Sequence, residues 1–360
     1  MASEATPETR SRGSASLAQC LIARPPGGRR CQWWVAALTL AASSVALVAQ
    51  NGSPAAYQPP RTPWGDPDLQ GVWPTTDFLG TPFQRPAEFG TRNTLTEAEF
   101  AARAEQARKQ VDTDNAEFEV ETADTSNAGE VGSATSPPPH WLERGRATRQ
   151  ASFVVDPPDG RVPALTAAGR QRVAAMQEAR RARGPADSWE DRSLWDRCLT
   201  RGLIGSILPT VYNAGNEIIQ APGYVVLRNE MIHEARVIPL DGRPHMNASV
   251  RAYMGDSRGR WDGNTRVVRT TNLTGRTAVG PGGPHSAAAT ITERFTRVDA
   301  NTLQYEATID DPETWTRPWT IAFPWRRDDN YHLFEYACHE GNYAMRNILS
   351  GERAKERGAK

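Results

Sequence analysis

Residues 289–310 read ATITERFTRVDANTLQYEATID, and this stretch decides the fold of the chain. Apolar and polar residues alternate at every second position on both sides of Asp299-Ala300-Asn301. A period of two is typical of a half-buried β-strand, and a cluster of turn residues between two such runs indicates a hairpin. The stretch therefore predicts two antiparallel strands, over 289–299 and 302–310.

The same pattern continues outward over residues 216–352. Turn signals at Pro222-Gly223, Asp241-Gly242 and Asp262-Gly263-Asn264 separate further alternating runs at hairpin spacing. Because closing a sheet removes its exposed edges, about eight such strands predict a mainly β fold, an antiparallel, lipocalin-like meander barrel with room for one small ligand. The other predicted strands span residues 217–220, 224–228, 231–238, 249–253, 258–271, 315–323 and 331–339.

The residues before 216 predict elements that pack outside the barrel. Proline and tryptophan crowd residues 57–89, which we expect to form an extended arm anchored by Trp64, Trp73 and Phe83. Thr96 and Glu99 have the spacing of a capping box, in front of an amphipathic helix over 95–111. A flexible connection over 112–139, a short strand over 152–155 and a helix over 167–183 capped by Thr166 complete this part.

An apolar run over residues 33–49 follows Arg24, Arg29 and Arg30 and ends in small residues. Such a run is typical of a secretory signal, whereas a spanning helix usually needs ~20 residues. We therefore predict export to the periplasm or the medium, with cleavage near residues 46–56 and no membrane span afterwards; a retained single anchor is the alternative. The predicted parts are a signal peptide and disordered start over 1–56, arm and helices over 57–215, barrel over 216–352 and tail over 353–360.

Signal cleavage would leave Cys198 and Cys338 as the only pair of cysteines. In an oxidising compartment this pair favours one disulfide, and closing so long a loop contributes about 4–5 kcal/mol in the chain-entropy model. A catalytic thiol or a zinc thiolate is the alternative, although the chain contains no CxxC motif. The 42 basic and 42 acidic residues balance, so the composition does not indicate nucleic acid as a partner.

Longer motifs lie along most of the chain after residue 57, among them TPWGDPDLQGVW (62–73), MGDSRGRW (254–261) and EYACHEGNY (335–343). In these motifs the chain resembles a broad family of exported, mostly uncharacterised bacterial proteins. The resemblance implies one integrated unit and brings no particular activity with it. The hairpins at Trp261-Asp262-Gly263-Asn264-Thr265 and Glu293-Arg294-Phe295 also resemble those of lipocalin-like (calycin) barrels.

Strand parity places ionisable groups on faces that otherwise have a buried pattern. His233 shares a face with Leu227 and Asn229, and Glu335 and His339 share a face of the last predicted strand. Buried ionisable groups are costly unless they are paired or used, so these residues form the predicted site. We predict that His233 and His339 exchange protons and that Glu335 orients them or acts as the base. For each histidine taken alone, a satisfied core residue is the alternative.

Arg317, on the same predicted strand as Trp315, is the candidate for holding a substrate. A guanidinium flanked by aromatic rings either clamps a buried carboxylate, here Glu293 or Glu335, or binds an anionic or aromatic ligand. Asp256 lies in a polar loop, either as a carboxylate at the mouth of the barrel or as a turn residue. The predicted substrate-binding residues are Arg317, Trp315, Asn229, Glu293, Asp256 and Tyr305.

Together these residues predict an exported enzyme that performs acid-base chemistry on a small hydrophobic or aromatic, oxygen-bearing molecule, as a lyase, isomerase, cyclase or hydrolase. No cofactor is predicted, and a metal held by His233, His339 and a carboxylate is the competing possibility. Two other classes stay open. One is a periplasmic small-molecule-binding protein without catalysis, and the other is a structural module attached to an envelope partner through the tryptophan-rich arm. The sequence leaves the oligomeric state open.

Overall fold

The larger of two sheets contains six strands, and every pair of neighbours is antiparallel. The computed structural model describes residues 57–123, 141–340 and 343–358, so the predicted signal peptide lies outside the described residues. The strands follow the order β2 (Val154–Asp156), β10 (Trp319–Arg326), β9 (Thr302–Asp310), β8 (Thr290–Arg297), β7 (Thr265–Thr271) and β6 (Asp256–Asp262).

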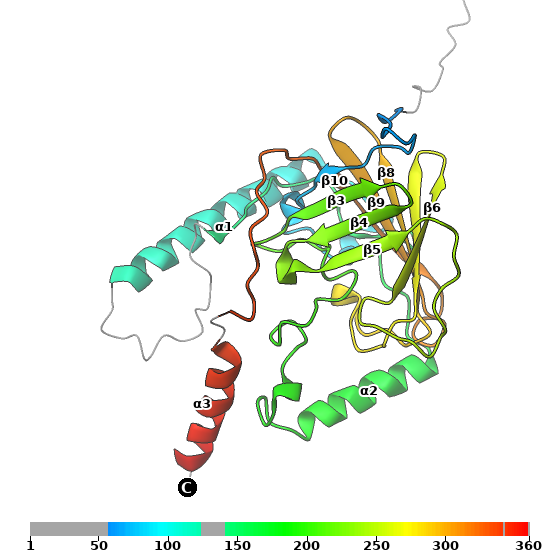
Figure 1. Ribbon diagram of the computed structural model, residues 1–360. Coiled ribbons are helices and arrows are strands. Elements are labelled where there is room, and N and C mark those ends of the chain that lie inside the picture. Colours follow the sequence, from blue (N-terminus) through cyan, green and yellow to red (C-terminus); the bar gives the residue numbers. More distant parts are fainter. Residues whose placement is uncertain (1–56, 124–140, 341–342, 359–360) are drawn as a thin grey trace, which may run out of the picture. The chain divides into compact units, whose positions relative to one another are not determined.

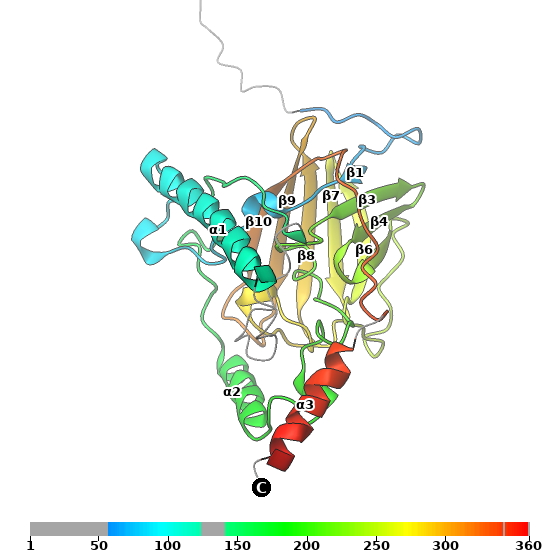
Figure 2. The same ribbon diagram turned by 90° about the vertical axis from the view of Figure 1, so that its left-hand side faces the viewer.

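The smaller sheet contains four antiparallel strands and lies against the larger one (Figures 1 and 2). Its order is β1 (Gly71–Val72), β3 (Asn216–Ala221), β4 (Tyr224–Asn229) and β5 (Ala235–Pro239). Side chains from both sheets belong to one buried core, with Leu227 on one side and Tyr305 and Trp325 on the other. The predicted mainly β, antiparallel class is confirmed.

The two sheets do not form a closed barrel in the described residues, because no ladder joins β5 to β6 or β10 to β3. The sheets meet at one edge without a ladder, where side chains from β5 and the residue after it lie against the backbone of β6. A Cβ added at Gly259 of β6 would lie 2.7 Å from Leu240 and 3.0 Å from Ile238, so glycine permits this approach. The lipocalin-like closure predicted from the sequence is therefore not confirmed.

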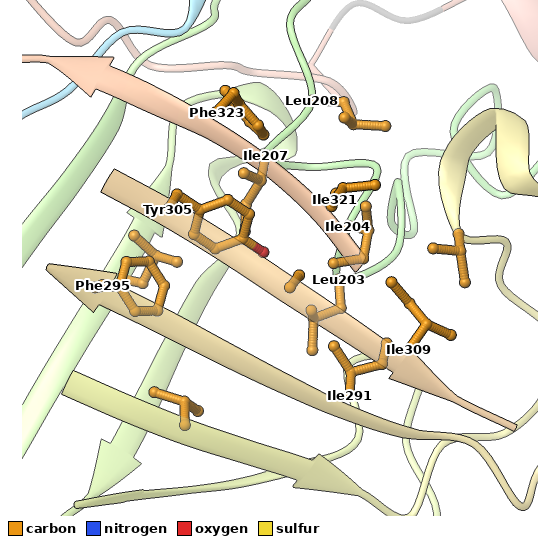
Figure 3. Packing of buried hydrophobic residues seen from close by; sticks show 14 of the residues in the cluster. Leu203, Ile204, Ile207, Leu208, Ile291, Phe295, Tyr305, Ile309, Ile321 and Phe323 are labelled. Atoms are coloured by element: carbon orange, nitrogen blue, oxygen red, sulfur yellow. The ribbon is translucent and has the colours of Figure 1, made fainter. Parts of the chain in front are cut away.

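A buried segment between the sheets fills the centre of the core. Leu203, Ile204 and Ile207 are at most 2% exposed, and Figure 3 shows them beside Ile309 and Ile321 of the larger sheet. This segment follows Gly202, whose φ of +78° suits glycine, in a sharp change of direction. The middle of the chain thus supplies part of the core instead of packing outside it.

Three helices are present in the described residues, α1 (Glu97–Ala123), α2 (Ala167–Arg181) and α3 (Ala344–Gly358). The predicted capping box is confirmed, because Glu99 accepts from the Thr96 amide and Thr96 Oγ1 accepts from the Glu99 amide. Thr166 caps α2 as predicted. Helix α1 runs twelve residues beyond the predicted end at 111, since the acidic stretch that follows contains no helix breaker before 123.

The arm over residues 57–89 contacts the sheets through only some of its aromatic side chains. Trp73 is fully buried and Phe83 packs against the core, but Trp64 is 37% exposed and is not an anchor. Gly71 and Val72 pair with β3, so the arm contributes a strand to the smaller sheet. The described residues from 57 onward belong to one compact unit.

Candidate functional site

The three residues predicted to be catalytic do not point into the core. His233, Glu335 and His339 are all exposed. Nδ1 of His233 lies 2.9 Å from the carbonyl oxygen of Tyr336, which places this histidine against the segment that carries the other two. Their predicted inward orientation is wrong, and the water-poor surroundings that motivated an acid-base site are missing for them.

A change of strand parity explains the position of His233. A 3₁₀ helix, η6 (Met231–His233), separates β4 from β5, and Ile232 and His233 have positive φ values of 60° and 43°. The predicted strand over 231–238 is therefore interrupted. Because side chains alternate only along an unbroken strand, the interruption turns Arg236 inward, although an unbroken strand would have placed it on the face opposite to His233.

The predicted strand over 331–339 is an irregular segment held by polar contacts. The Tyr331 hydroxyl lies 2.7 Å from Glu230 Oε2 and 2.8 Å from Glu143 Oε2. Glu230 also accepts from the Phe334 amide at 2.9 Å. Burial raises the pKa of Glu143, against hydrogen bonds from Tyr331 and from two backbone amides. The Phe334 amide, which a strand would pair in a ladder, bonds to a side chain instead, and the apolar alternation in this segment does not produce a strand.

Arg317 and Trp315 lie before the start of β10 and not on it. Arg317 is exposed and forms an ion pair of 2.9 Å with Asp156, so it binds neither Glu293 nor Glu335. Trp315 is buried and meets the Trp319 ring edge-on at 5.3 Å. Pro318 separates the two parts of the predicted strand over 315–323, which explains why only the second part enters the sheet.

Glu293 and Tyr305 do come together, and Arg236, which was not among the predicted site residues, is the third member of their network. Arg236 donates to both carboxylate oxygens of Glu293 at 2.6 and 2.8 Å, and the Tyr305 hydroxyl donates to Oε1 at 3.0 Å. The Arg236 and Glu293 side chains are 3% and 0% exposed. Burial raises the pKa of Tyr305, so this hydroxyl stays protonated as a donor. The network is a buried ion pair with a bidentate contact, although Nε of Arg236 has no hydrogen-bond partner in the described residues, and it suits a role in holding the sheets together.

Asn229 and Asp256 belong to two other local networks. Asn229 is buried and donates to the side chain of Asn216 at 2.6 Å. Asp256 accepts from the Met246 amide and lies 2.9 Å from Nδ1 of His245 and 2.5 Å from Arg258. Asp256 is the first residue of β6 and holds the segment around His245 and Met246, so it is not the loop or turn residue that the sequence predicted.

A groove of roughly 560 Å³ lies between α2, the segment 190–201 and the loop 275–284. Five arginines and one glutamate line it, together with the indole of Trp195. Guanidinium groups bind carboxylates and phosphates through paired hydrogen bonds, so a wall with this composition favours an anionic ligand. The lining arginines are Arg180, Arg192, Arg197, Arg201 and Arg276.

Arg201 is the best-placed cation of this groove. Its guanidinium carbon lies 5.0 Å from the centre of the Trp195 ring, and its Nη1 has no hydrogen-bond partner in the described part of the chain. Burial lowers the pKa of Arg201, and the nearby hydroxyls of Tyr212 and Tyr336 oppose that shift. At neutral pH the group remains a cation, so its charge would attract an anion in the groove, although the unpaired Nη1 itself is buried.

The predicted disulfide is confirmed and holds this wall of the groove. Cys198 and Cys338 are bonded, with their Cα atoms 5.7 Å apart. Gly202 then brings the chain against the loop on the opposite wall, since a Cβ at Gly202 would lie 3.0 Å from Cβ of Thr277. The covalent link and the close approach fix Arg201 relative to the loop after β7.

Apart from Cys198, none of the site residues predicted from the sequence lies in the cluster 190–201. The available signal was the density of arginine and tryptophan in WEDRSLWDRCLTR (189–201) next to a cysteine expected to be bridged.

In the described residues no group of three His, Cys, Asp or Glu side chains is arranged to hold a metal ion. No described helix has the length and apolar character needed to cross a membrane.

Comparison of the chain with models of protein families, with curated proteins and with solved structures found no match in any of the three.

Proposed function

We propose that this chain is an exported small-molecule-binding protein that holds an organic anion in the arginine-lined groove. The ligand class is a small molecule with carboxylate or phosphate groups, because both match the fork of a guanidinium. One observation carries the proposal: Arg201 lies in the wall of the groove and forms no ion pair with a carboxylate of the described residues. Export is part of the proposal, and the Cys198–Cys338 disulfide supports it.

The charge balance around the groove supports binding of an anion over binding of a neutral molecule. Only Glu190 opposes the five lining arginines, and Asp196 neutralises one of them through a 3.2 Å ion pair with Arg192. The remaining positive charge would attract an anion electrostatically and would make its affinity depend on ionic strength.

This proposal keeps one part of the lipocalin-like prediction, the order of the strands, and leaves out the closed barrel. Strands β3 to β10 pair in chain order except at the step from β5 to β6, which is the order of a meander. In this proposal the ligand lies outside the sheets, because the segment around Ile204 and Ile207 occupies their interior. Catalysis by His233, His339 and Glu335 stays a prediction, and their exposure removes the main physical reason for choosing them.

Titration calorimetry of the full chain with citrate, and separately with inorganic phosphate, tests the proposal and distinguishes the two ligand chemistries. A hydrogen bond to a charged group contributes about 1.5–3 kcal/mol, so Arg201→Met should weaken binding by roughly 10-fold to 150-fold. Arg181→Met is the matched control, because Arg181 is exposed on α2, carries the same charge and does not line the groove.

The control variant should bind within about twofold of the unmodified chain, since the screened charge of an exposed arginine contributes little at this separation. Equal losses in the two variants would show that overall charge, and not the groove, holds the anion. Failure of the unmodified chain to bind either anion at low ionic strength would also reject the proposal.

A further inference from the structure

A hydroxyl and an imidazole lie within hydrogen-bond reach of each other beside the groove. Oγ1 of Thr277 is 2.7 Å from Nε2 of His285, and Nδ1 of His285 is 2.8 Å from the carbonyl oxygen of Ser286. Thr277 lines the groove although it is only 6% exposed, and His285 is 2% exposed behind it. Neither residue was among the site residues predicted from the sequence.

The partners of His285 define how its protons are arranged. A carbonyl oxygen only accepts, so Nδ1 carries the proton and donates to Ser286, which leaves Nε2 as the acceptor for the Thr277 hydroxyl. Burial lowers the pKa of His285, and this keeps the ring neutral at pH 7. The threonine hydroxyl therefore points its proton at an unprotonated base.

Local structure fixes this geometry. Ala278 and Pro284 form an isolated antiparallel bridge, so Thr277 and His285 lie opposite each other across the turn that contains Gly280 and Gly283. The backbone behind the histidine is also held, because Asp311 accepts from the Ser286 amide at 2.6 Å and from its hydroxyl at 2.7 Å. A nucleophile, a base and a group that orients the base are the three parts that activated hydroxyl catalysis requires.

We propose that Thr277 is a nucleophile, with His285 as its general base, for hydrolysis of esters that carry a second, anionic group. The inference rests on the proposed function, since the arginines of the groove would hold the anionic group while Thr277 Oγ1 reaches the ester carbon. Arg201 and Arg276 line the same groove and supply positive charge for the carbonyl oxygen as it becomes negative.

The reaction needs no reactant besides water. His285 Nε2 takes the hydroxyl proton as Thr277 Oγ1 bonds to the acyl carbon, the bond from this carbon to the leaving oxygen breaks, and the imidazolium returns the proton to that oxygen. Water then loses a proton to Nε2 and attacks the acyl-threonine. The threonine oxygen leaves with that proton, so an ester and water give an acid and an alcohol.

The experiment uses the full chain with 4-nitrophenyl hemisuccinate as the anionic ester and 4-nitrophenyl acetate as the neutral one. Nitrophenolate release is followed over time, and acid-quenched samples are searched by mass spectrometry for a succinylated peptide containing Thr277. The unmodified chain should favour the anionic ester. Thr277→Val and His285→Gln should each lose at least about 100-fold in kcat, whereas Thr277→Ser should keep measurable turnover because it keeps the hydroxyl.

Several results would overturn the inference. They are a Thr277→Val variant as fast as the unmodified chain, an acyl group found only on another residue, or no turnover by a chain that binds citrate. The last result would leave the proposed function intact, whereas a chain that binds no anion would reject the proposed function. If Thr277→Val does not fold, the acylated peptide of the unmodified chain and the rate of Thr277→Ser decide the question.

Discussion

Replacement of Glu293 by glutamine should destabilise the protein far more than loss of a surface ion pair. Glu293 is 0% exposed and receives two hydrogen bonds from Arg236 and one from Tyr305. Glutamine keeps the volume but removes the charge, so the Arg236 guanidinium is left buried without a counter-ion. Breaking a buried pair in this way costs about 3–5 kcal/mol. For a unit of this size that corresponds to a decrease of roughly 5–10 °C in Tm.

Urea denaturation followed by tryptophan fluorescence measures the cost, and an unchanged slope shows that the unfolding transition itself is the same. Glu217→Gln is the matched control, because Glu217 pairs with Arg228 across two neighbouring strands at 2.8 Å on the exposed face. Its loss should cost less than about 1 kcal/mol. Similar costs for Glu293→Gln and Glu217→Gln would refute the argument that the buried network joins the two sheets.

Three further predictions concern other contacts. Replacing Cys198 and Cys338 by serine should lower the free energy of unfolding by about 4–5 kcal/mol, since the disulfide spans 140 residues; a loss below about 1 kcal/mol in urea would contradict this. Arg266→Met should raise stability by about 1–3 kcal/mol. The Arg266 side chain is 1% exposed and lies over Trp261, its guanidinium has no hydrogen-bond partner in the described residues, and burial lowers its pKa to about 10. A lower Tm for the variant would contradict this prediction. The pKa of Glu143 is raised in the folded state, so its contribution to stability falls as pH rises. The free energy of unfolding of the unmodified chain, measured relative to Glu143→Gln, should therefore decrease between about pH 4 and pH 7, and an increase would count against it.

The strands themselves were largely predictable because local pattern and turn chemistry agree. Strand β9 has the predicted bounds, Thr302–Asp310, and β8 differs from its prediction by one residue at the start and two at the end. The turns at Gly223 and Gly263 both have positive φ, as hairpins with glycine require. These strands and turns depend on residues close in sequence, so the local pattern is enough to predict them.

The inward residues of β5 were not predictable from alternation. Met231 and Ile232 are consecutive and both buried, so the pattern does not show that a 3₁₀ turn replaces a strand there. At Arg236, five residues after Met231, the alternation of inward and outward side chains is inverted, so Arg236 points inward. A one-residue shift of this kind moves every following side chain to the opposite face.

The groove could not be assembled from sequence because its walls come from distant segments. Met176 of α2, Trp195 and Thr277 line the same space, and only the tertiary fold brings them together. The sequence did predict the disulfide that anchors one wall, from the count of cysteines and the compartment. It gave no reason to separate Arg201 from the many arginines that face solvent.

Hydrogen exchange of the full chain with and without citrate tests the central claim most directly, because it locates the bound anion. Binding in the groove should slow exchange of amides within residues 192–201 and 275–280, while strands β8 and β9 keep their rates. Slower exchange confined to residues 290–310 or to the arm over 57–89 would place the anion elsewhere, and it would contradict the assignment of the groove around Arg201 as the binding site.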